Sequence, residues 1–183
     1  AISADAIWSP ENGVYVVGPG FSIPAGITLT IERGTIVKFN IATGGLITHL
    51  EVLGNLVVNG TDSDPVYFTS IRDDSVGGDT NGDGNSTSPS PINWIGIIFR
   101  SGSSGALSHG VVRYSGAFDG FYRAGVFNYG GNVSIDHVSF ENNFQADIYQ
   151  QSGTTAVVRS KFDYDNFAIK IDDATFLTPR RKT

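Results

Sequence analysis

The chain has 183 residues, with 23 glycines, no cysteine, no methionine and a formal net charge of −6. The acidic balance argues against a nucleic-acid partner, and the lack of cysteine excludes disulfides and thiol chemistry. No apolar run approaches the roughly 20 residues that span a membrane as a helix. We therefore expect one domain over residues 1–183, with no nucleic-acid partner and no membrane span.

The N-terminal part of the chain has the pattern of short strands and turns. Residues 1–26 are predicted to be a cap, with a strand at 14–17 followed by turns containing glycine and proline. Because the chain starts at Ala1 without a basic and apolar leader, we expect a processed secreted protein or a fragment.

Apolar residues then alternate at 27–31 and 37–39, which is the period of strands with one buried face. The alternation returns 21 positions later. The proposed equivalent pairs are Leu29 and Leu50, Ile31 and Val52, and Val37 and Val58. Short strands that recur at such a spacing are typical of a β-solenoid, in which successive turns of the chain stack on one another.

The periodicity stops at residues 72–93, which are rich in Asp, Asn, Gly and Ser. A structureless insertion of this length is usually functional or disordered. The segment from Asp79 to Gly84 has the D-x-N-x-D-G spacing of the first half of an EF-hand-like calcium loop. The twelfth position of such a loop, normally an acid, is Ser90, so further carboxylates would have to complete the coordination shell.

The sequence thus predicts a Ca²⁺ site in this insertion. The expected ligands are Asp73, Asp74, Asp79, Asn81 and Asp83. The alternative is a hydrophilic loop with turns made by Asp and Asn side chains and no metal.

The clearest repeat lies between residues 133 and 166. The positions Val133, Ile135, Val138 and Phe140 return 22 residues later as Thr155, Val157, Ser160 and Phe162. Two further segments fit the same frame, namely Gly105, Leu107, Gly110 and Val112, and then Ile169, Ile171, Ala174 and Phe176. The fold predicted from these repeats is an all-β parallel solenoid with coils of about 21–23 residues and one long loop insertion. Phe140 and Phe162 should stack inside it, and residues 177–183 should form a tail.

Several phrases of the sequence resemble bacterial secreted proteins of the right-handed parallel β-helix, pectate-lyase-like superfamily. They are IPAGITLTIERGTIVKF from residue 23, DPVYFTS from residue 64, DDSVGGDTNGDG from residue 73 and WIGIIF from residue 94. The resemblance implies a right-handed parallel β-helix in an extracellular or cell-surface protein, whose β-helix is commonly not an enzyme. It also implies that a lyase of this fold would place Arg or Lys beside Ca²⁺-binding acids.

Other groups are weaker candidates for chemistry. His109 and His137 occupy matching positions of the repeat and could form a metal or catalytic pair, although corner histidines without such a role are more common. An acidic cluster near the C-terminus could act in glycoside hydrolysis or bind Ca²⁺, and otherwise forms a solvated face; it comprises Asp163, Asp165, Asp172 and Asp173. The candidate lyase arginines are Arg100, Arg113, Arg123 and Arg159.

Aromatic residues between two predicted coils are candidates for binding sugar rings, since aromatic faces stack on them, although the same residue types also serve as core. The predicted ligand-binding residues are Tyr114, Phe118, Phe121, Tyr122 and Tyr129, in a group that also contains Phe127. Three functions follow from the sequence: a non-catalytic domain that binds a glycan or surface or acts as a spacer, a polysaccharide lyase or hydrolase, and a subunit that self-associates end to end.

Overall fold

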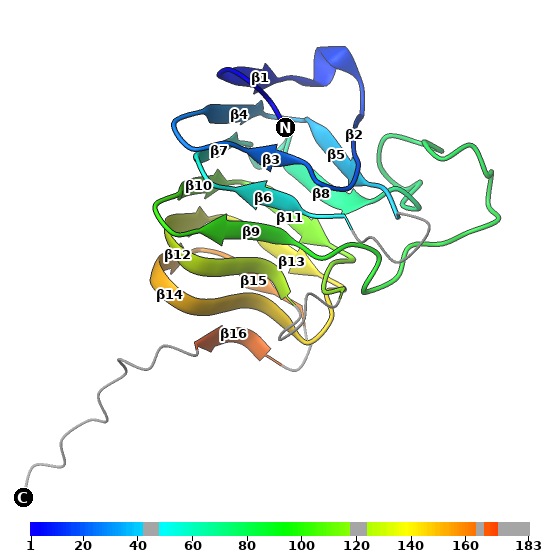
Figure 1. Ribbon diagram of the computed structural model, residues 1–183. Coiled ribbons are helices and arrows are strands. Elements are labelled where there is room, and N and C mark those ends of the chain that lie inside the picture. Colours follow the sequence, from blue (N-terminus) through cyan, green and yellow to red (C-terminus); the bar gives the residue numbers. More distant parts are fainter. Residues whose placement is uncertain (42–47, 118–123, 164–166, 172–183) are drawn as a thin grey trace, which may run out of the picture.

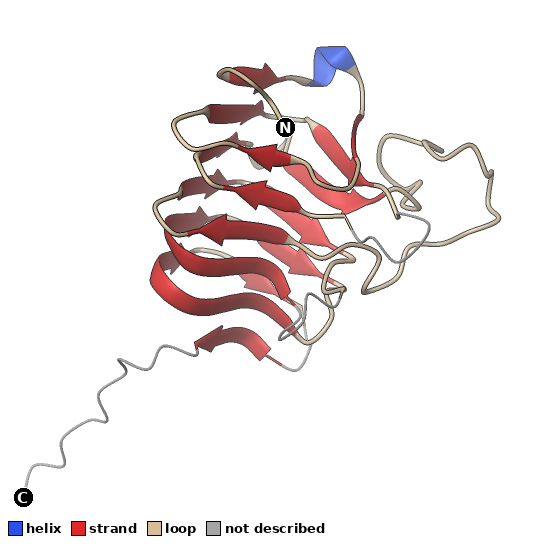
Figure 2. Cartoon of the chain, viewed as in Figure 1, coloured by secondary structure: helices blue, strands red, loops and turns tan. Residues whose placement is uncertain are grey.

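The computed structural model describes residues 1–41, 48–117, 124–163 and 167–171, and these are almost entirely β-strands and connecting loops (Figures 1 and 2). The helical element among them is a short 3-10 turn, η1 (Pro10–Asn12). The first eight strands are β1 (Ala6–Trp8), β2 (Tyr15–Val17), β3 (Ser22–Ile23), β4 (Thr28–Glu32), β5 (Ile36–Phe39), β6 (Leu50–Val52), β7 (Asn55–Asn59) and β8 (Val66–Ser70). The others are β9 (Ile97–Arg100), β10 (Ser104–Ser108), β11 (Gly110–Arg113), β12 (Ala124–Asp136), β13 (Ser139–Glu141), β14 (Ala146–Val158), β15 (Lys161–Phe162) and β16 (Phe167–Ile171).

The described strands form two sheets in which every pairing is parallel. The larger sheet has the order β1-β4-β7-β10-β12-β9-β6-β3, with β14 beside β12 and β16 beside β14. The smaller sheet has the order β15-β13-β11-β8-β5-β2. The chain passes repeatedly from one sheet to the other, and the larger sheet curls around the space between them (Figure 1).

The register confirms the repeat around Phe140 and corrects the repeat near the N-terminus. Val133 pairs with Thr155, and Phe140 pairs with Phe162, with their rings stacked at 5.4 Å between centroids. Leu29, however, pairs with Leu56 and not with Leu50.

The other predicted equivalent positions near the N-terminus are likewise wrong, whereas those of β10 are confirmed. Ile31 pairs with Val58 rather than Val52, and Val37 pairs with Phe68 rather than Val58. Gly105 and Leu107 pair with Val133 and Ile135 as predicted, but 28 positions separate the partners. The uniform spacing of 21–23 residues is therefore wrong, because connecting loops of different length separate the strands.

The last predicted repeat is also out of register. Ile169 pairs with Ile148, so it does not continue the row that contains Val133 and Thr155. The other two positions of that repeat, Ala174 and Phe176, lie outside the described residues, as does the predicted tail at 177–183.

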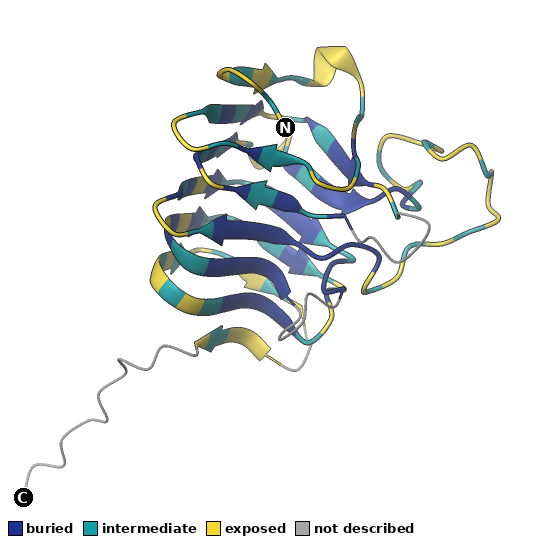
Figure 3. Ribbon diagram, viewed as in Figure 1, coloured by how far each residue is buried: buried dark blue, intermediate teal, exposed yellow. Residues whose placement is uncertain are grey.

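The core fills the space between the two sheets and consists of the apolar positions that point inward from each strand (Figure 3). Leu29, Leu56 and Phe68 are completely buried there. Phe39 and Trp94 stack with 3.9 Å between ring centroids, and the Trp94 indole donates a hydrogen bond to the Arg113 carbonyl at 2.9 Å. The alternation of apolar residues along each strand thus positions the outward-facing side chains, which carry the candidate sites.

The predicted cap at 1–26 contains β1, β2 and β3, and all three are edge strands: β1 and β3 end the larger sheet and β2 ends the smaller sheet. In this segment the Trp8 ring stacks on Tyr15 at 4.5 Å. The segment between β8 and β9, which includes 72–93, contains no strand and projects from the smaller sheet as a long loop (Figure 1).

Candidate functional site

The insertion at 72–93 begins with a buried ion pair that attaches it to the smaller sheet. Asp73 is buried, and Nη2 of Arg113 lies 2.6 Å from its Oδ2, while Nε of Arg113 donates a hydrogen bond to the same oxygen at 2.8 Å. The other carboxylate oxygen accepts a hydrogen bond from the Ser75 hydroxyl at 2.6 Å. Burial opposes ionisation of Asp73, but hydrogen bonds from Ser75 and Thr69 and the charge of Arg113 outweigh it, so the pKa is lowered.

Beyond this attachment, three carboxylates converge in the loop. The side chains of Asp74, Asp79 and Asp83 place oxygen atoms within 4.8 Å of one another. Oδ1 of Asp74 and Oδ1 of Asp83 are inaccessible to solvent and have no hydrogen-bond partner. Buried polar atoms are normally satisfied, and clustered carboxylate oxygens are the ligands that Ca²⁺ prefers.

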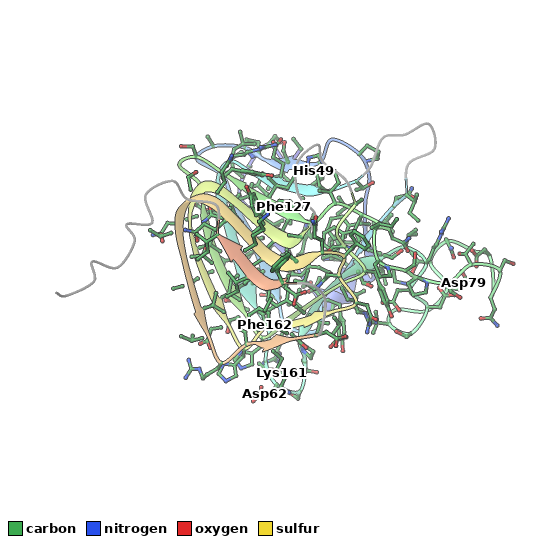
Figure 4. The ribbon with its side chains drawn as sticks, turned by 90° about the horizontal axis from the view of Figure 1, so that it is seen from below. His49, Asp62, Asp79, Phe127, Lys161 and Phe162 are labelled. Carbon is green, nitrogen blue, oxygen red and sulfur yellow. The ribbon has the colours of Figure 1, made fainter. Side chains whose placement is uncertain are left out.

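Asp79 lies in the part of the loop that projects from the sheets (Figure 4), and its carboxylate holds a turn of the backbone. Its carboxylate accepts hydrogen bonds from the backbone N–H groups of Gly84 and Gly82, each at 2.8 Å, and from that of Asp83 at 3.2 Å. Gly82 and Gly84 have φ angles of 71° and 65°, which favour glycine. The hydrogen bond from Gly84 is the largest of the effects that lower the pKa of Asp79, so this carboxylate is held ionised.

The remaining two predicted ligands lie near this cluster but make other contacts. Asp73 is occupied by Arg113 and Ser75, as described above. The side-chain amide of Asn81 donates hydrogen bonds to Asp83 at 2.8 Å and to Thr87 at 3.3 Å. The structure thus brings together Asp74, Asp79 and Asp83 from the predicted set and uses Asp73 to anchor the loop.

Two basic residues, Arg113 and Lys38, lie beside these acids, although the sequence does not predict that they belong to this site. No motif in the sequence joins Arg113 to the acids, and none marks Lys38. Lys38 is completely buried, and its Nζ donates a hydrogen bond to the Gly78 carbonyl at 2.6 Å. The alternation of β5 predicts only that Lys38 faces outward, since Val37 and Phe39 are core residues.

His109 and His137 lie together at a corner of the fold, with their rings stacked at 4.4 Å between centroids. Both have positive φ angles, 52° and 53°, and they directly follow Ser108 and Asp136, which pair across β10 and β12, so they occupy equivalent corners. Nε2 of His109 is 3.5 Å from Asp62, and Nδ1 of His137 is 2.8 Å from Asp136.

A shallow surface hollow surrounds these rings, and its lining includes Asp62, Arg159 and Lys161. Figure 4 shows Asp62 and Lys161 at this corner, away from Asp79. The two histidines are therefore neighbours, as their matching positions predicted, and they are separate from the acidic loop.

The other predicted acids and arginines do not share one site. Arg100 pairs with Glu51 at 2.9 Å, and Arg159 pairs with Asp136 on another part of the surface. Arg123 lies outside the described residues, as do three of the four C-terminal acids, Asp165, Asp172 and Asp173. Among the residues that the structure describes, Arg113 is the predicted arginine that contacts an acid of the loop.

The aromatic candidates that can be located are held by different neighbours. Tyr114 follows β11 in the smaller sheet, and the Arg113 guanidinium lies over its ring at 5.5 Å. Tyr129 belongs to β12 in the larger sheet, where its ring is 5.9 Å from those of Phe127 and Tyr149. Phe127 is completely buried and cannot be a surface contact. The predicted residues Phe118, Phe121 and Tyr122 lie outside the described residues.

Comparison with known proteins adds no family to these observations. No family model matches the chain, and neither a curated protein nor a solved structure matches it. Within the described part of the chain, no helix has the length and apolar character needed to cross a membrane.

Proposed function

We propose that this chain is a right-handed parallel β-helix domain of an extracellular or cell-surface protein, which binds Ca²⁺ in the 72–93 loop and does not catalyse a reaction. Parallel pairing in two sheets and repeated passage of the chain between them support this architecture. Membership of the pectate-lyase-like superfamily is part of the proposal and rests on the sequence phrases quoted above.

The observation that carries the proposal is the convergence of Asp74, Asp79 and Asp83 within 4.8 Å, with two buried oxygens that lack a hydrogen-bond partner. Carboxylates at this separation repel one another, and a divalent cation would remove the repulsion and satisfy the free oxygens. Backbone carbonyls and water would complete the six to eight oxygen ligands that Ca²⁺ takes.

A non-catalytic role is supported by how the basic groups beside these acids are used. The Arg113 guanidinium is bonded to Asp73 and Ser75, and its side chain is only 12% exposed. Lys38 is covered by the loop and bonded to Gly78. Both groups are thus bonded within the attachment of the loop, whereas a catalytic site needs basic groups that can meet a substrate together with the carboxylates.

The calcium proposal is tested by melting the protein with and without Ca²⁺. A ligand at about one hundred times its Kd stabilises the native state by about 2.7 kcal/mol. For a domain of this size we expect Tm to rise by about 5–10 °C, since each kcal/mol shifts it by about 2–4 °C. The Asp79→Ala, Asp83→Ala double variant should lose the response, whereas Asp5→Ala, which changes an acid bonded to Thr28 of β4, should keep it. An equal Ca²⁺ response in the loop variant would refute the site.

The proposed partner is a polysaccharide or cell-surface glycan, held by weak contacts that include the Tyr129 ring. A polysaccharide panel should be read by pull-down and by product release, each with and without Ca²⁺. Retention without products supports a binding domain, and loss of retention in Tyr129→Ala would locate the contact. A spacer would show neither signal.

The main alternative is a polysaccharide lyase or glycoside hydrolase of the same fold. It is favoured by one observation, that Arg113 and Lys38 lie beside the acids of the loop. Unsaturated or reducing-end products that disappear in Arg113→Met but persist in Arg100→Met would establish the enzyme and overturn the proposal.

End-to-end self-association is a further alternative. The strand β16 pairs only with β14 among the described strands, and it exposes Phe167, Ile169 and Ile171. Apolar strands at a sheet edge can pair with another chain. Filaments in negative-stain images that disappear when Ile169 is replaced by Lys would favour this function.

A further inference from the structure

Lys38 is a charged residue that the smaller sheet and the loop bury completely. It lies in the middle of β5, with its side chain on the outer face of the sheet, opposite the core residues Val37 and Phe39. Its strand partner is Thr69 of β8, whose hydroxyl donates a hydrogen bond to Asp73. A buried ammonium group is costly unless it is paired, so its surroundings require an explanation.

The loop provides those surroundings. Lys38 donates its hydrogen bond to the carbonyl of Gly78, which directly precedes Asp79. At Gly77, an added Cβ atom would lie 2.6 Å from the Val14 side chain and 3.3 Å from that of Ile36 in β5, so the loop backbone packs closely against the sheet at this point. The loop therefore crosses the outer face of the smaller sheet through contacts at Lys38 and at Arg113.

The charges around Lys38 belong to the same acids that form the candidate site. Burial lowers the pKa of Lys38, and the negative charges of Asp73, Asp74 and Asp79 oppose this effect. Lys38 in turn contributes to the lowered pKa of Asp79, after the larger effect of the backbone hydrogen bonds. Lys38 and the acids thus compensate one another electrostatically across the contact between loop and sheet.

We propose that Lys38 is the internal cation of this loop, and that its charge keeps residues 73–84 folded against the smaller sheet without a bound metal ion. The loop is then ordered before any ligand arrives. A second consequence rests on the proposed Ca²⁺ site: a divalent cation must bind beside a fixed positive charge, so removal of that charge should tighten Ca²⁺ binding several-fold.

Hydrogen exchange in EDTA tests the first consequence with two variants. Lys38→Met removes the charge and the donor, whereas Lys38→Gln keeps a donor for Gly78 without the charge. We expect the amides of Gly82 and Gly84, which are bonded to Asp79, to exchange about tenfold faster in both variants than in the wild type. The matched control is Lys161→Met, which removes an exposed lysine from the same sheet. Amides of β12 and β14 report whether the fold is intact.

The outcomes separate the inference from the calcium proposal. If both variants exchange less than about twofold faster than the wild type, Lys38 does not hold the loop and the inference is wrong. If Lys38→Gln behaves like the wild type while Lys38→Met does not, a hydrogen bond and not the charge holds the loop, which also overturns it. If the loop loosens in both variants but neither they nor the wild type respond to Ca²⁺, the inference stands and the calcium site fails.

Discussion

The buried ion pair of Asp73 and Arg113 gives the sharpest stability prediction. The two residues differ in the contacts that each would keep after its partner is removed, so the two substitutions should have unequal costs. Removal of one partner of a buried ion pair costs about 3–5 kcal/mol, mostly because the other charge is left uncompensated. Asp73 is 1% exposed, so in Arg113→Met its charge stays buried with neutral donors, and we expect about 3–5 kcal/mol. Arg113 also lies 3.6 Å from Glu141 and keeps some contact with solvent, so Asp73→Asn should cost less, about 2–3 kcal/mol.

Guanidinium unfolding of the two single variants and the double variant measures these values and the coupling between the residues. The double variant should cost less than the sum of the single variants, because the second substitution removes the charge that the first left unpaired. A cost below about 1 kcal/mol for Arg113→Met, or additive effects, would show that the pair does not attach the loop as described.

The same pair predicts a pH dependence with a definite sign. Because the pKa of Asp73 is lower in the folded state, its contribution to stability is complete above the pKa of an unfolded Asp, which is about 4. That contribution is lost as the pH falls through the folded-state pKa. Asp73→Asn should therefore flatten the acid limb of the curve of stability against pH, and an unchanged limb would contradict the assignment.

Two further predictions concern packing. Phe140 is 1% exposed, so Phe140→Ala should lower the free energy of unfolding by about 3–5 kcal/mol. Phe162 is only partly buried, so Phe162→Ala should cost about half as much. Equal costs in denaturant unfolding would contradict the observed burial. An added Cβ at Gly60 would lie 2.0 Å from the His109 carbonyl oxygen, so Gly60→Ala should lower Tm by several degrees, and an unchanged Tm would show that the corner is not this close.

The sequence predicted the parts of the fold that depend on local pattern. The stacking of Phe140 on Phe162 follows from a repeat whose connecting segments have equal length. The predicted equivalence of Leu29 and Leu50 is wrong because β6 and β7 both present inward-facing apolar residues two positions apart. In the structure β4 pairs with β7, whereas β6 pairs with β9 through Leu50 and Ile97. The apolar pattern alone does not show which of the two strands lies beside β4.

The acidic loop was predicted by its spacing, but its attachment was not. Asp79 and Asp83 are close in sequence, so the spacing of the motif is enough to bring their carboxylates together. Contacts of the loop with Lys38 and Arg113 join positions about 40 residues apart, and they depend on where a segment without periodicity lies on the sheet. The predicted aromatic group rests on proximity in sequence alone, whereas Tyr114 follows β11 of the smaller sheet and Tyr129 lies in β12 of the larger sheet.

Isothermal titration of the protein with CaCl₂ after treatment with EDTA tests the central claim most directly. The proposed site predicts one Ca²⁺ bound per chain, with binding abolished in the Asp74→Asn, Asp79→Asn double variant and retained in Asp62→Asn, which changes an acid at the histidine corner. A wild-type titration without binding heat, together with no Ca²⁺-dependent change in Tm, would contradict the calcium-binding domain proposed for this chain.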